Sequence, residues 1–130
     1  MARAPMKTIL VADDNEANRE LVTIILEREG YRVIGAANGR EALDLFQQQK
    51  PDLVLLDIHM PEMNGYDAVR AMRAQSPVRV LPMVALTASA MPGDSDEAMS
   101  HGFDAYLAKP YEISTVIALV KQMLNDPSEY

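Results

Sequence analysis

The sequence contains no cysteine and no tryptophan, and only two histidines among its 130 residues. Without cysteine the chain can form neither a disulfide framework nor a thiolate metal site, which agrees with a reducing compartment. The two histidines, His59 and His101, are not placed as a pair that would bind a transition metal. These absences exclude disulfide-stapled domains and cysteine-based metal modules.

Long hydrophobic runs and positive charge are also scarce. No apolar stretch approaches the roughly 20 residues that cross a bilayer, and the N-terminal "MARAPMKT" lacks the apolar centre of a signal peptide. We therefore expect a cytoplasmic protein without membrane contact. Twelve Lys and Arg against 19 Asp and Glu give a net charge of −7. This balance argues against direct nucleic-acid binding, which needs a basic surface.

Five apolar runs of strand length recur along the chain, at residues 8–12, 32–36, 52–56, 82–86 and 105–108. They alternate with segments whose apolar residues show helical spacing. A length of 130 residues is that of one ordinary domain, so we expect a single domain over residues 1–130, and the 48% of apolar residues indicate that it folds. Strands that are apolar on both sides and alternate with helices predict an α/β fold, a parallel sheet with helices on both faces.

The first helical segment illustrates the spacing. Leu21, Ile24 and Ile25 follow the i, i+3, i+4 pattern and are expected to face the core. Gly30 is expected to end this helix in a left-handed conformation. Four further helices are expected around residues 42–46, 66–73, 94–100 and 116–124.

Polar residues follow the ends of four of the predicted strands. Asp13 and Asp14 follow the first, Asp57 the third, Thr87 the fourth and Lys109 the fifth. In a sheet with the order 2-1-3-4-5, the carboxyl ends of the parallel strands lie on one edge, and strands one and three flank the point where the order reverses. Ligands of open α/β sheets bind at that point. The sequence therefore predicts a site with three carboxylates, a hydroxyl and an ammonium.

Three converging carboxylates repel one another, so either one takes a proton or a cation neutralises them. Carboxylate oxygens suit a hard cation, above all Mg²⁺. A divalent ion and a lysine ammonium beside one carboxylate are what a phosphoryl group needs for its oxygens. Aspartate can itself act as the nucleophile and form an acyl phosphate.

These motifs resemble the receiver domains of two-component response regulators over residues 7 to about 124. The matching strings are "ILVADDN" (9–15), "DLVLLDIHMPEMNG" (52–65), "VALTA" (84–88) and "GFDAYLAKP" (102–110). The resemblance implies a flavodoxin-like, doubly wound sheet of five parallel strands in the order 2-1-3-4-5, with helices on both faces. It also implies phosphoryl transfer from a histidine kinase, or a histidine phosphotransfer protein, to an aspartate.

The resemblance also assigns roles to single residues. Asp57 is the implied phosphoacceptor, and Thr87 and Lys109 are the implied contacts of its phosphoryl group. Tyr106 matches the aromatic switch position that moves together with Thr87. The implied Mg²⁺ ligands are Asp13, Asp14, Asp57 and the backbone carbonyl of His59, and the Lys109–Pro110 peptide is expected to be cis.

The function that follows is a phosphorylation-dependent signalling switch. Phosphorylation would change the face formed by the fourth helix, fifth strand and fifth helix, and so alter the binding of a downstream protein target. The chain would be a monomer or a weak, phosphorylation-linked dimer, and not an enzyme beyond its own phosphorylation and dephosphorylation. The sequences of its motifs are similar to those of receivers of hybrid histidine kinases and of stand-alone cell-cycle regulators. The chain is therefore either a stand-alone regulator or an excised receiver, and both interpretations stay open.

Three rival functions remain to be weighed against this one. A phosphatase of the haloacid dehalogenase type needs an acid two residues after its nucleophile, where this chain has His59. A flavodoxin-like FMN carrier needs a phosphate-binding loop after the first strand, where the two acids would repel phosphate. An interaction domain that has lost phosphorylation would not need the complete set of acids, threonine and lysine.

Overall fold

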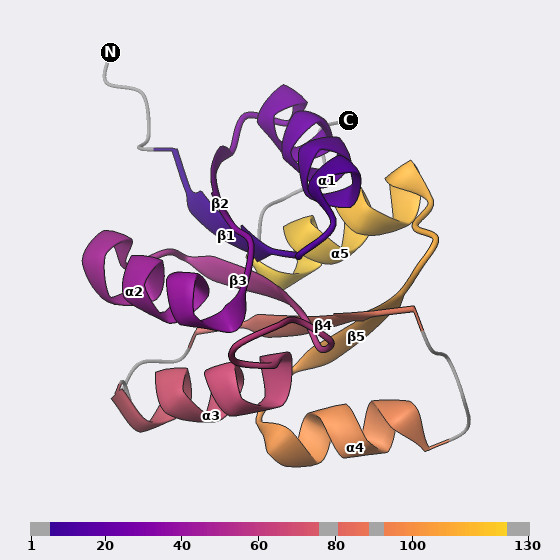
Figure 1. The fold of residues 1–130 in the computed structure, drawn as a ribbon. Coiled ribbons are helices and arrows are strands. Elements are labelled where there is room, and N and C mark those ends of the chain that lie inside the picture. Colours follow the sequence, from indigo (N-terminus) through magenta and orange to yellow (C-terminus); the bar gives the residue numbers. More distant parts are fainter. Residues whose placement is uncertain (1–5, 76–80, 89–92, 125–130) are drawn as a thin grey trace.

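The computed structural model describes residues 6–75, 81–88 and 93–124, in which five strands alternate with five helices (Figure 1). The elements are β1 (Thr8–Ala12), α1 (Glu16–Arg28), β2 (Arg32–Ala36), α2 (Gly39–Gln49), β3 (Leu53–Asp57), α3 (Gly65–Gln75), β4 (Met83–Thr87), α4 (Asp94–His101), β5 (Ala105–Ala108) and α5 (Ile113–Met123). This is the alternation that the sequence predicts.

The strands form one parallel sheet in the order β2-β1-β3-β4-β5. The flavodoxin-like, doubly wound α/β fold with helices on both faces is therefore confirmed. β1 lies between β2 and β3, so the strand order reverses beside β1. The three inner strands are almost completely buried, whereas β2 at the edge is only partly covered.

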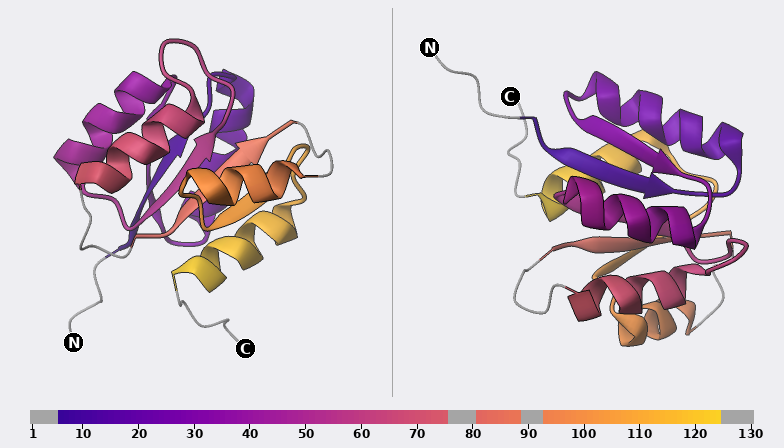
Figure 2. Two further views of the ribbon diagram at one scale, coloured as in Figure 1. Left: turned by 90° about the horizontal axis from the view of Figure 1, so that it is seen from below. Right: turned by 60° about the vertical axis from the view of Figure 1, so that its left-hand side comes forward.

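Two hydrophobic layers hold the helices on the sheet. On one face α2, α3 and α4 contribute Phe46, Val69 and Ala98, and on the other α1 and α5 contribute Val22 and Val116. Figure 2 shows the two helix layers on opposite sides of the sheet. Of the helices that the structure describes, none is long and apolar enough to cross a membrane.

Two expected strands are displaced by one residue. The runs 52–56 and 82–86 are observed as Leu53–Asp57 and Met83–Thr87. Asp57 is paired with Leu86, and Thr87 with Ala108, so both polar residues belong to the sheet itself. The pairing of the neighbouring strand extends each ladder to its polar residue, and this fixes the backbone that carries each side chain.

The prediction that Leu21, Ile24 and Ile25 face the core is wrong in part. Leu21 and Ile24 are 44% and 50% exposed, while Val22, Ile25 and Leu26 are buried. Leu21 and Ile24 extend the apolar surface beyond one side of the buried stripe, next to Ile25, so spacing alone selected a face rotated from the one that contacts the sheet. Gly30 has a φ of 94° just beyond this helix, which confirms its left-handed conformation.

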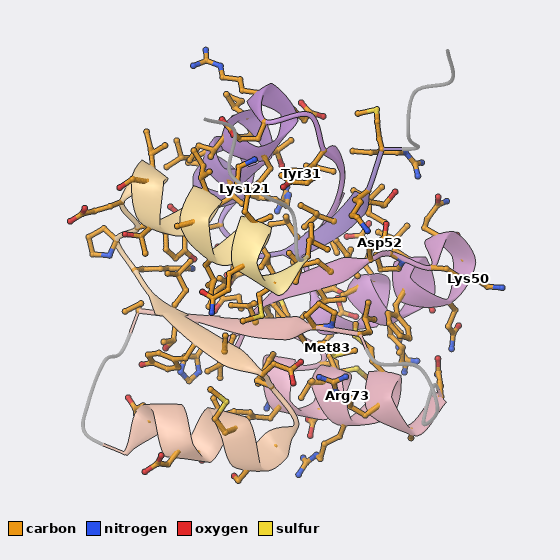
Figure 3. All side chains as sticks on the ribbon, turned by 180° about the vertical axis from the view of Figure 1, so that it is seen from behind. Tyr31, Lys50, Asp52, Arg73, Met83 and Lys121 are labelled. Carbon is orange, nitrogen blue, oxygen red and sulfur yellow. The ribbon has the colours of Figure 1, made fainter. Side chains whose placement is uncertain are left out.

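Arg73, near the end of α3, links the segments that lead into β4 and β5 (Figure 3). Its guanidinium donates to the carbonyl oxygens of Gly102 and Leu81 and pairs with Asp104 at 2.6 Å. Asp104 also accepts a hydrogen bond from the amide of Met83. These contacts fix the starts of β4 and β5, and thereby the opposite ends, where the polar residues lie.

Candidate functional site

The carboxyl ends of four strands bring the predicted site residues to one edge of the sheet. Asp13 follows β1 directly, Asp57 ends β3, Thr87 ends β4, and Lys109 follows β5. Residues that are far apart in the chain meet because parallel strands all end on the same side.

Three carboxylates form the centre of this edge. One oxygen each from Asp13, Asp14 and Asp57 lie within 4.8 Å of one another. Asp13 and Asp57 are only 1% and 4% exposed, whereas Asp14 is open to solvent. Two buried carboxylates and one exposed carboxylate fit a hard divalent cation that takes oxygen ligands and keeps some of its water.

Lys109 joins the two buried carboxylates. Its Nζ lies 2.9 Å from Asp13 Oδ2 and 3.1 Å from Asp57 Oδ2, and its backbone amide donates to the Thr87 carbonyl oxygen at 2.7 Å. Burial acts to lower the pKa of Lys109, but the contacts with the two carboxylates outweigh it and leave that pKa raised. The ammonium is therefore charged. The Lys109–Pro110 peptide is cis, as the resemblance implied.

Asp57 is held in an environment that disfavours its charge. Burial raises the pKa of its carboxyl, Lys109 lowers that pKa, and the charge of Asp13 raises it again, with a net increase. The amide of His59 donates to Asp57 Oδ1 at 3.2 Å, and this hydrogen bond orients the carboxylate. A second cation near this carboxylate would therefore be bound favourably.

The loop after β1 is positioned by α1. The Asn15 side chain caps the helix by accepting from the Asn18 amide, and the Asn15 amide donates to Asp13 Oδ1 at 2.9 Å. Arg19, one turn into the helix, donates to the Asp13 carbonyl oxygen at 2.7 Å. Sequence reasoning did not single out Arg19, because only the folded loop shows what its long side chain reaches.

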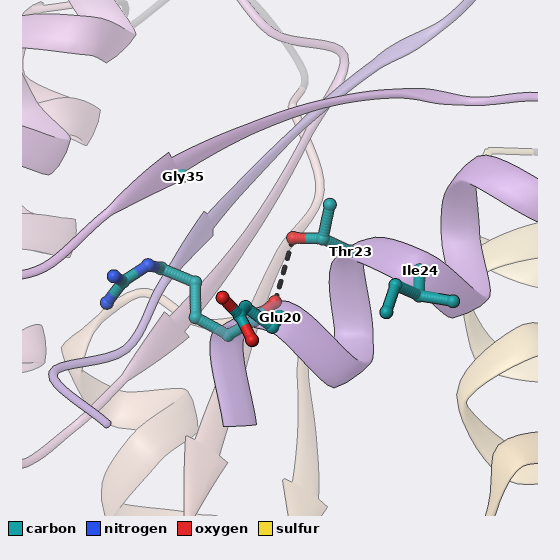
Figure 4. Close-up of a pocket in the computed structure, with 5 residues that line it drawn as sticks. Glu20, Thr23, Ile24 and Gly35 are labelled. Atoms are coloured by element: carbon teal, nitrogen blue, oxygen red, sulfur yellow. Dashed lines mark hydrogen bonds between the residues drawn. The ribbon is translucent and has the colours of Figure 1, made fainter. Parts of the chain in front are cut away.

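A surface hollow of about 440 Å³ lies beside this arginine, between α1 and β2 (Figure 4). It is lined by Arg19, Glu20, Thr23, Ile24 and Gly35. The stem of Arg19 passes so close to Gly35 that a Cβ there would lie 3.3 Å from its Cδ. The missing side chain in the edge strand thus leaves room for the arginine that supports Asp13.

Thr87 and Tyr106 are neighbours in the structure, as the predicted switch pair requires. Thr87 is 2% exposed at the end of β4, and Tyr106 is half-buried in the adjacent strand β5. Their side chains share a hydrogen bond, and burial raises the pKa of the Tyr106 phenol. A movement of Thr87 would therefore alter its hydrogen bond with Tyr106.

Two further residues, His59 and Tyr111, follow the strand-end residues Asp57 and Lys109 by two positions in the chain. His59 is in the turn behind Asp57 with its side chain exposed. Tyr111, two residues after Lys109, has a buried hydroxyl with no hydrogen-bond partner among the described residues. Sequence reasoning missed Tyr111. Its only signal was its position just after the Lys109–Pro110 pair.

Comparison with other sequences identifies a family to which this chain is similar. The family model described as the response regulator receiver domain matches residues 9–121. The polar-differentiation response regulator DivK of Brucella anthropi is 37% identical over 120 residues, which are 92% of this chain and 98% of that protein.

Solved structures show the same likeness. The chemotaxis response regulator CheY4 of Vibrio cholerae matches with a TM-score of 0.86 and 33% identity, over 92% of this chain and all of that chain. The receiver domain of the sensor histidine kinase PA1611 from Pseudomonas aeruginosa matches with a TM-score of 0.85 and 33% identity, over 93% and 99% of the two chains. That structure has a magnesium ion coordinated in its active site cleft. Sequence and fold thus agree over nearly the whole chain.

Proposed function

The chain belongs to the response regulator receiver domain family, the phosphorylation-dependent switches of two-component systems, and from this premise we propose that Asp57 accepts the phosphoryl group. The donor is a phosphohistidine of a histidine kinase or of a histidine phosphotransfer protein. An Asp57 oxygen attacks the phosphorus, the P–N bond breaks, and the imidazole leaves with its electron pair. The product on the chain is an aspartyl phosphate.

The observation that carries this proposal is the ammonium of Lys109 between two buried carboxylates, 2.9 Å from Asp13 and 3.1 Å from Asp57. A phosphoryl group on Asp57 would bring further negative charge to this ammonium, and the Lys109 contact would stabilise it. Thr87, buried at the neighbouring strand end, supplies a hydroxyl that can donate to a phosphoryl oxygen.

Mg²⁺ is the proposed cofactor of the site. Asp13, Asp14, Asp57 and the backbone carbonyl of His59 would hold it. When bound, it supplies positive charge against the three carboxylates and against the incoming phosphoryl oxygens. Support comes from the carboxylate oxygens within 4.8 Å of one another, an arrangement that needs a cation for balance.

The signal leaves the site through Thr87 and Tyr106. As Thr87 turns toward the phosphoryl group, its hydrogen bond with Tyr106 changes, and Tyr106 moves with it. Tyr106 lies in β5, which contacts α4 and precedes α5 in the chain. We assign the output to the face formed by α4, β5 and α5, where a shift between two populated states alters the binding of a downstream protein.

The protein is then a single receiver domain over residues 1–130 that acts in the cytoplasm. Its chemistry is limited to gaining and losing its own phosphoryl group. It works as a monomer, or as a weak dimer once phosphorylated, and contacts proteins and not nucleic acid. Turnover of external phosphomonoesters is not expected.

The test is phosphorylation by acetyl phosphate in the presence of Mg²⁺, followed by intact-mass spectrometry. The wild-type chain is expected to gain the mass of one phosphate, and Asp57→Asn to gain none. Asp44→Asn is the matched control, because it removes an exposed carboxylate on α2 and should be phosphorylated normally. A phosphate retained in Asp57→Asn would falsify the assignment.

A further inference from the structure

Arg19 contacts both ends of the loop that carries two of the three site carboxylates. Its guanidinium donates to the Asp13 carbonyl oxygen at 2.7 Å, and its backbone amide donates to the Asn15 carbonyl oxygen at 3.0 Å. The first contact fixes the peptide that joins Asp13 to Asp14, and the second begins the hydrogen bonding of α1. One residue thus holds the loop of residues 13–15 against the helix.

Asp14 depends most on this loop for its position. Its side chain is exposed, whereas the side chains of Asp13 and Asp57 are buried. The backbone on either side of Asp14 is held instead. Arg19 binds the carbonyl oxygen of Asp13, and the Asn15 amide donates to Asp13 Oδ1 at 2.9 Å. A ligand that is held in place before the ion arrives costs less to order on binding, so the ion is bound more tightly.

Gly35, in the edge strand β2, leaves the space that this arginine occupies. A Cβ at Gly35 would lie 3.3 Å from the Cδ and 3.6 Å from the Nε of Arg19, on the side of β2 that faces α1 (Figure 4). The backbone does not require a glycine here, because the φ of Gly35 is not in the left-handed region. Glycine weakens the interior of a strand and often marks a close approach of another group. The approach of Arg19 therefore explains the glycine.

We propose that Arg19 is a positioning residue of the magnesium site, which orders Asp13 and Asp14 through the peptide between them, and that Gly35 provides the space for it. The inference rests on the proposed function, because it assigns both residues to the site that holds the cation. Neither residue would contact the ion. Such outer partners orient metal ligands, and their loss weakens metal binding by about 10- to 100-fold.

The first experiment compares Mg²⁺ binding to the wild-type chain and to Arg19→Ala by isothermal titration calorimetry. We expect the variant to bind Mg²⁺ about 10-fold more weakly. The direction is diagnostic, because the loss of a positive charge near the site would by itself favour the binding of a cation. Arg28→Ala is the matched control. It removes the same charge from an exposed position in the last turn of α1 and should leave Mg²⁺ binding unchanged.

Phosphorylation by acetyl phosphate separates a displaced loop from a damaged site. At saturating Mg²⁺, Arg19→Ala should gain its phosphate at the wild-type rate, because the substitution leaves Asp57, Thr87 and Lys109 in place. At Mg²⁺ concentrations below the dissociation constant of the wild-type chain, the rate should fall about 10-fold, in parallel with the affinity. A rate that falls equally at both concentrations contradicts a positioning role.

Gly35→Val tests whether the glycine provides the space for the arginine. Valine is favoured in strands, but its side chain would occupy the place of the Arg19 stem. We therefore expect Gly35→Val to weaken Mg²⁺ binding in the wild-type chain and to cause no further loss in Arg19→Ala, because residues that act through one contact are not additive. Additive losses overturn the role of Gly35.

The outcomes separate the inference from the function on which it rests. Unchanged Mg²⁺ affinity in a folded Arg19→Ala, or an equal loss in Arg28→Ala, overturns the role of Arg19 and leaves the proposed function intact. A wild-type chain that binds Mg²⁺ but gains no phosphate overturns the proposed function alone, and one that binds no Mg²⁺ overturns both. If circular dichroism shows that Arg19→Ala does not fold, Gly35→Val decides, and unchanged affinity in that variant rejects the inference.

Discussion

At the scale of single residues, the site holds charge at a cost to stability. Asp57 is 4% exposed and lies beside Asp13, and the pKa of its carboxyl is raised above its ordinary value of 3.8 by burial, although Lys109 opposes the increase. A carboxyl whose pKa is raised on folding binds its proton more tightly in the folded chain than in the unfolded one. Its contribution to stability is therefore present below pH 3.8 and is lost as the pH rises through the raised value.

A neutral side chain at this position should remove that loss. We expect Asp57→Asn, without metal, to have a higher melting temperature than the wild-type chain at pH 7. The difference should shrink as the pH falls toward 4, where the wild-type carboxyl takes up its proton. Melting curves followed by circular dichroism between pH 4 and 7 measure this. Asp44→Asn serves as control, because it removes an exposed carboxylate outside the site. We expect the melting temperature of this variant to follow the same pH profile as that of the wild-type chain. A lower melting temperature for Asp57→Asn at pH 7 would mean that Lys109 outweighs burial.

At the scale of the elements, α1 contains leucines that look equivalent in the sequence but differ in burial. Leu26 is completely buried against the sheet, whereas Leu21 on the same helix is 44% exposed. We expect Leu26→Ala to lower the free energy of unfolding by about 2–5 kcal/mol, because it leaves a cavity. Leu21→Gln should change it by no more than about 0.5 kcal/mol. Urea denaturation measures both, and equal losses would contradict the orientation of α1.

The strands were more predictable than this helix for a physical reason. A strand buried on both faces must be apolar throughout, so a run such as residues 53–56 is recognised without knowing its neighbours. The face of a helix depends on which neighbours it contacts. Leu21, Ile24 and Ile25 fit a stripe as well as Val22, Ile25 and Leu26 do, and only packing on the sheet decides between them.

The candidate site was predictable where backbone position alone decides it. Strand ends placed Asp13, Asp57 and Lys109 together, since parallel topology leaves them no other place. Contacts made by long or aromatic side chains were not predictable. The reach of Arg19 to the Asp13 carbonyl and the burial of the Tyr111 hydroxyl depend on loops whose path no local pattern specifies.

Gly65 shows the same limit at the start of α3. Its φ is not in the left-handed region, so relief of backbone strain does not explain the glycine. Instead, a Cβ at this position would collide with the carbonyl oxygen of Asp57, and the Gly65 amide donates to the Ile58 carbonyl oxygen at 2.8 Å. The glycine lets α3 begin directly against the strand end that carries the proposed phosphoacceptor.

At the scale of the whole molecule, the net charge of −7 and the three gathered carboxylates both favour a cation, but through different physics. A general excess of negative charge is screened by any salt, and the effect depends on ionic strength alone. A site with oxygens in fixed positions responds to one ion and stabilises the fold in proportion to the logarithm of its concentration.

The melting temperature distinguishes these two effects. At constant ionic strength, Mg²⁺ at ten times its dissociation constant should stabilise the chain by about 1.4 kcal/mol, which corresponds to about 5 °C for a domain of this size. Asp14→Asn should lose most of this increase without loss of metal-free stability, because Asp14 is an exposed member of the cluster. An equal response to Mg²⁺ and to KCl of matched ionic strength would mean that the net charge alone attracts the ion, since only a site distinguishes ions at the same screening.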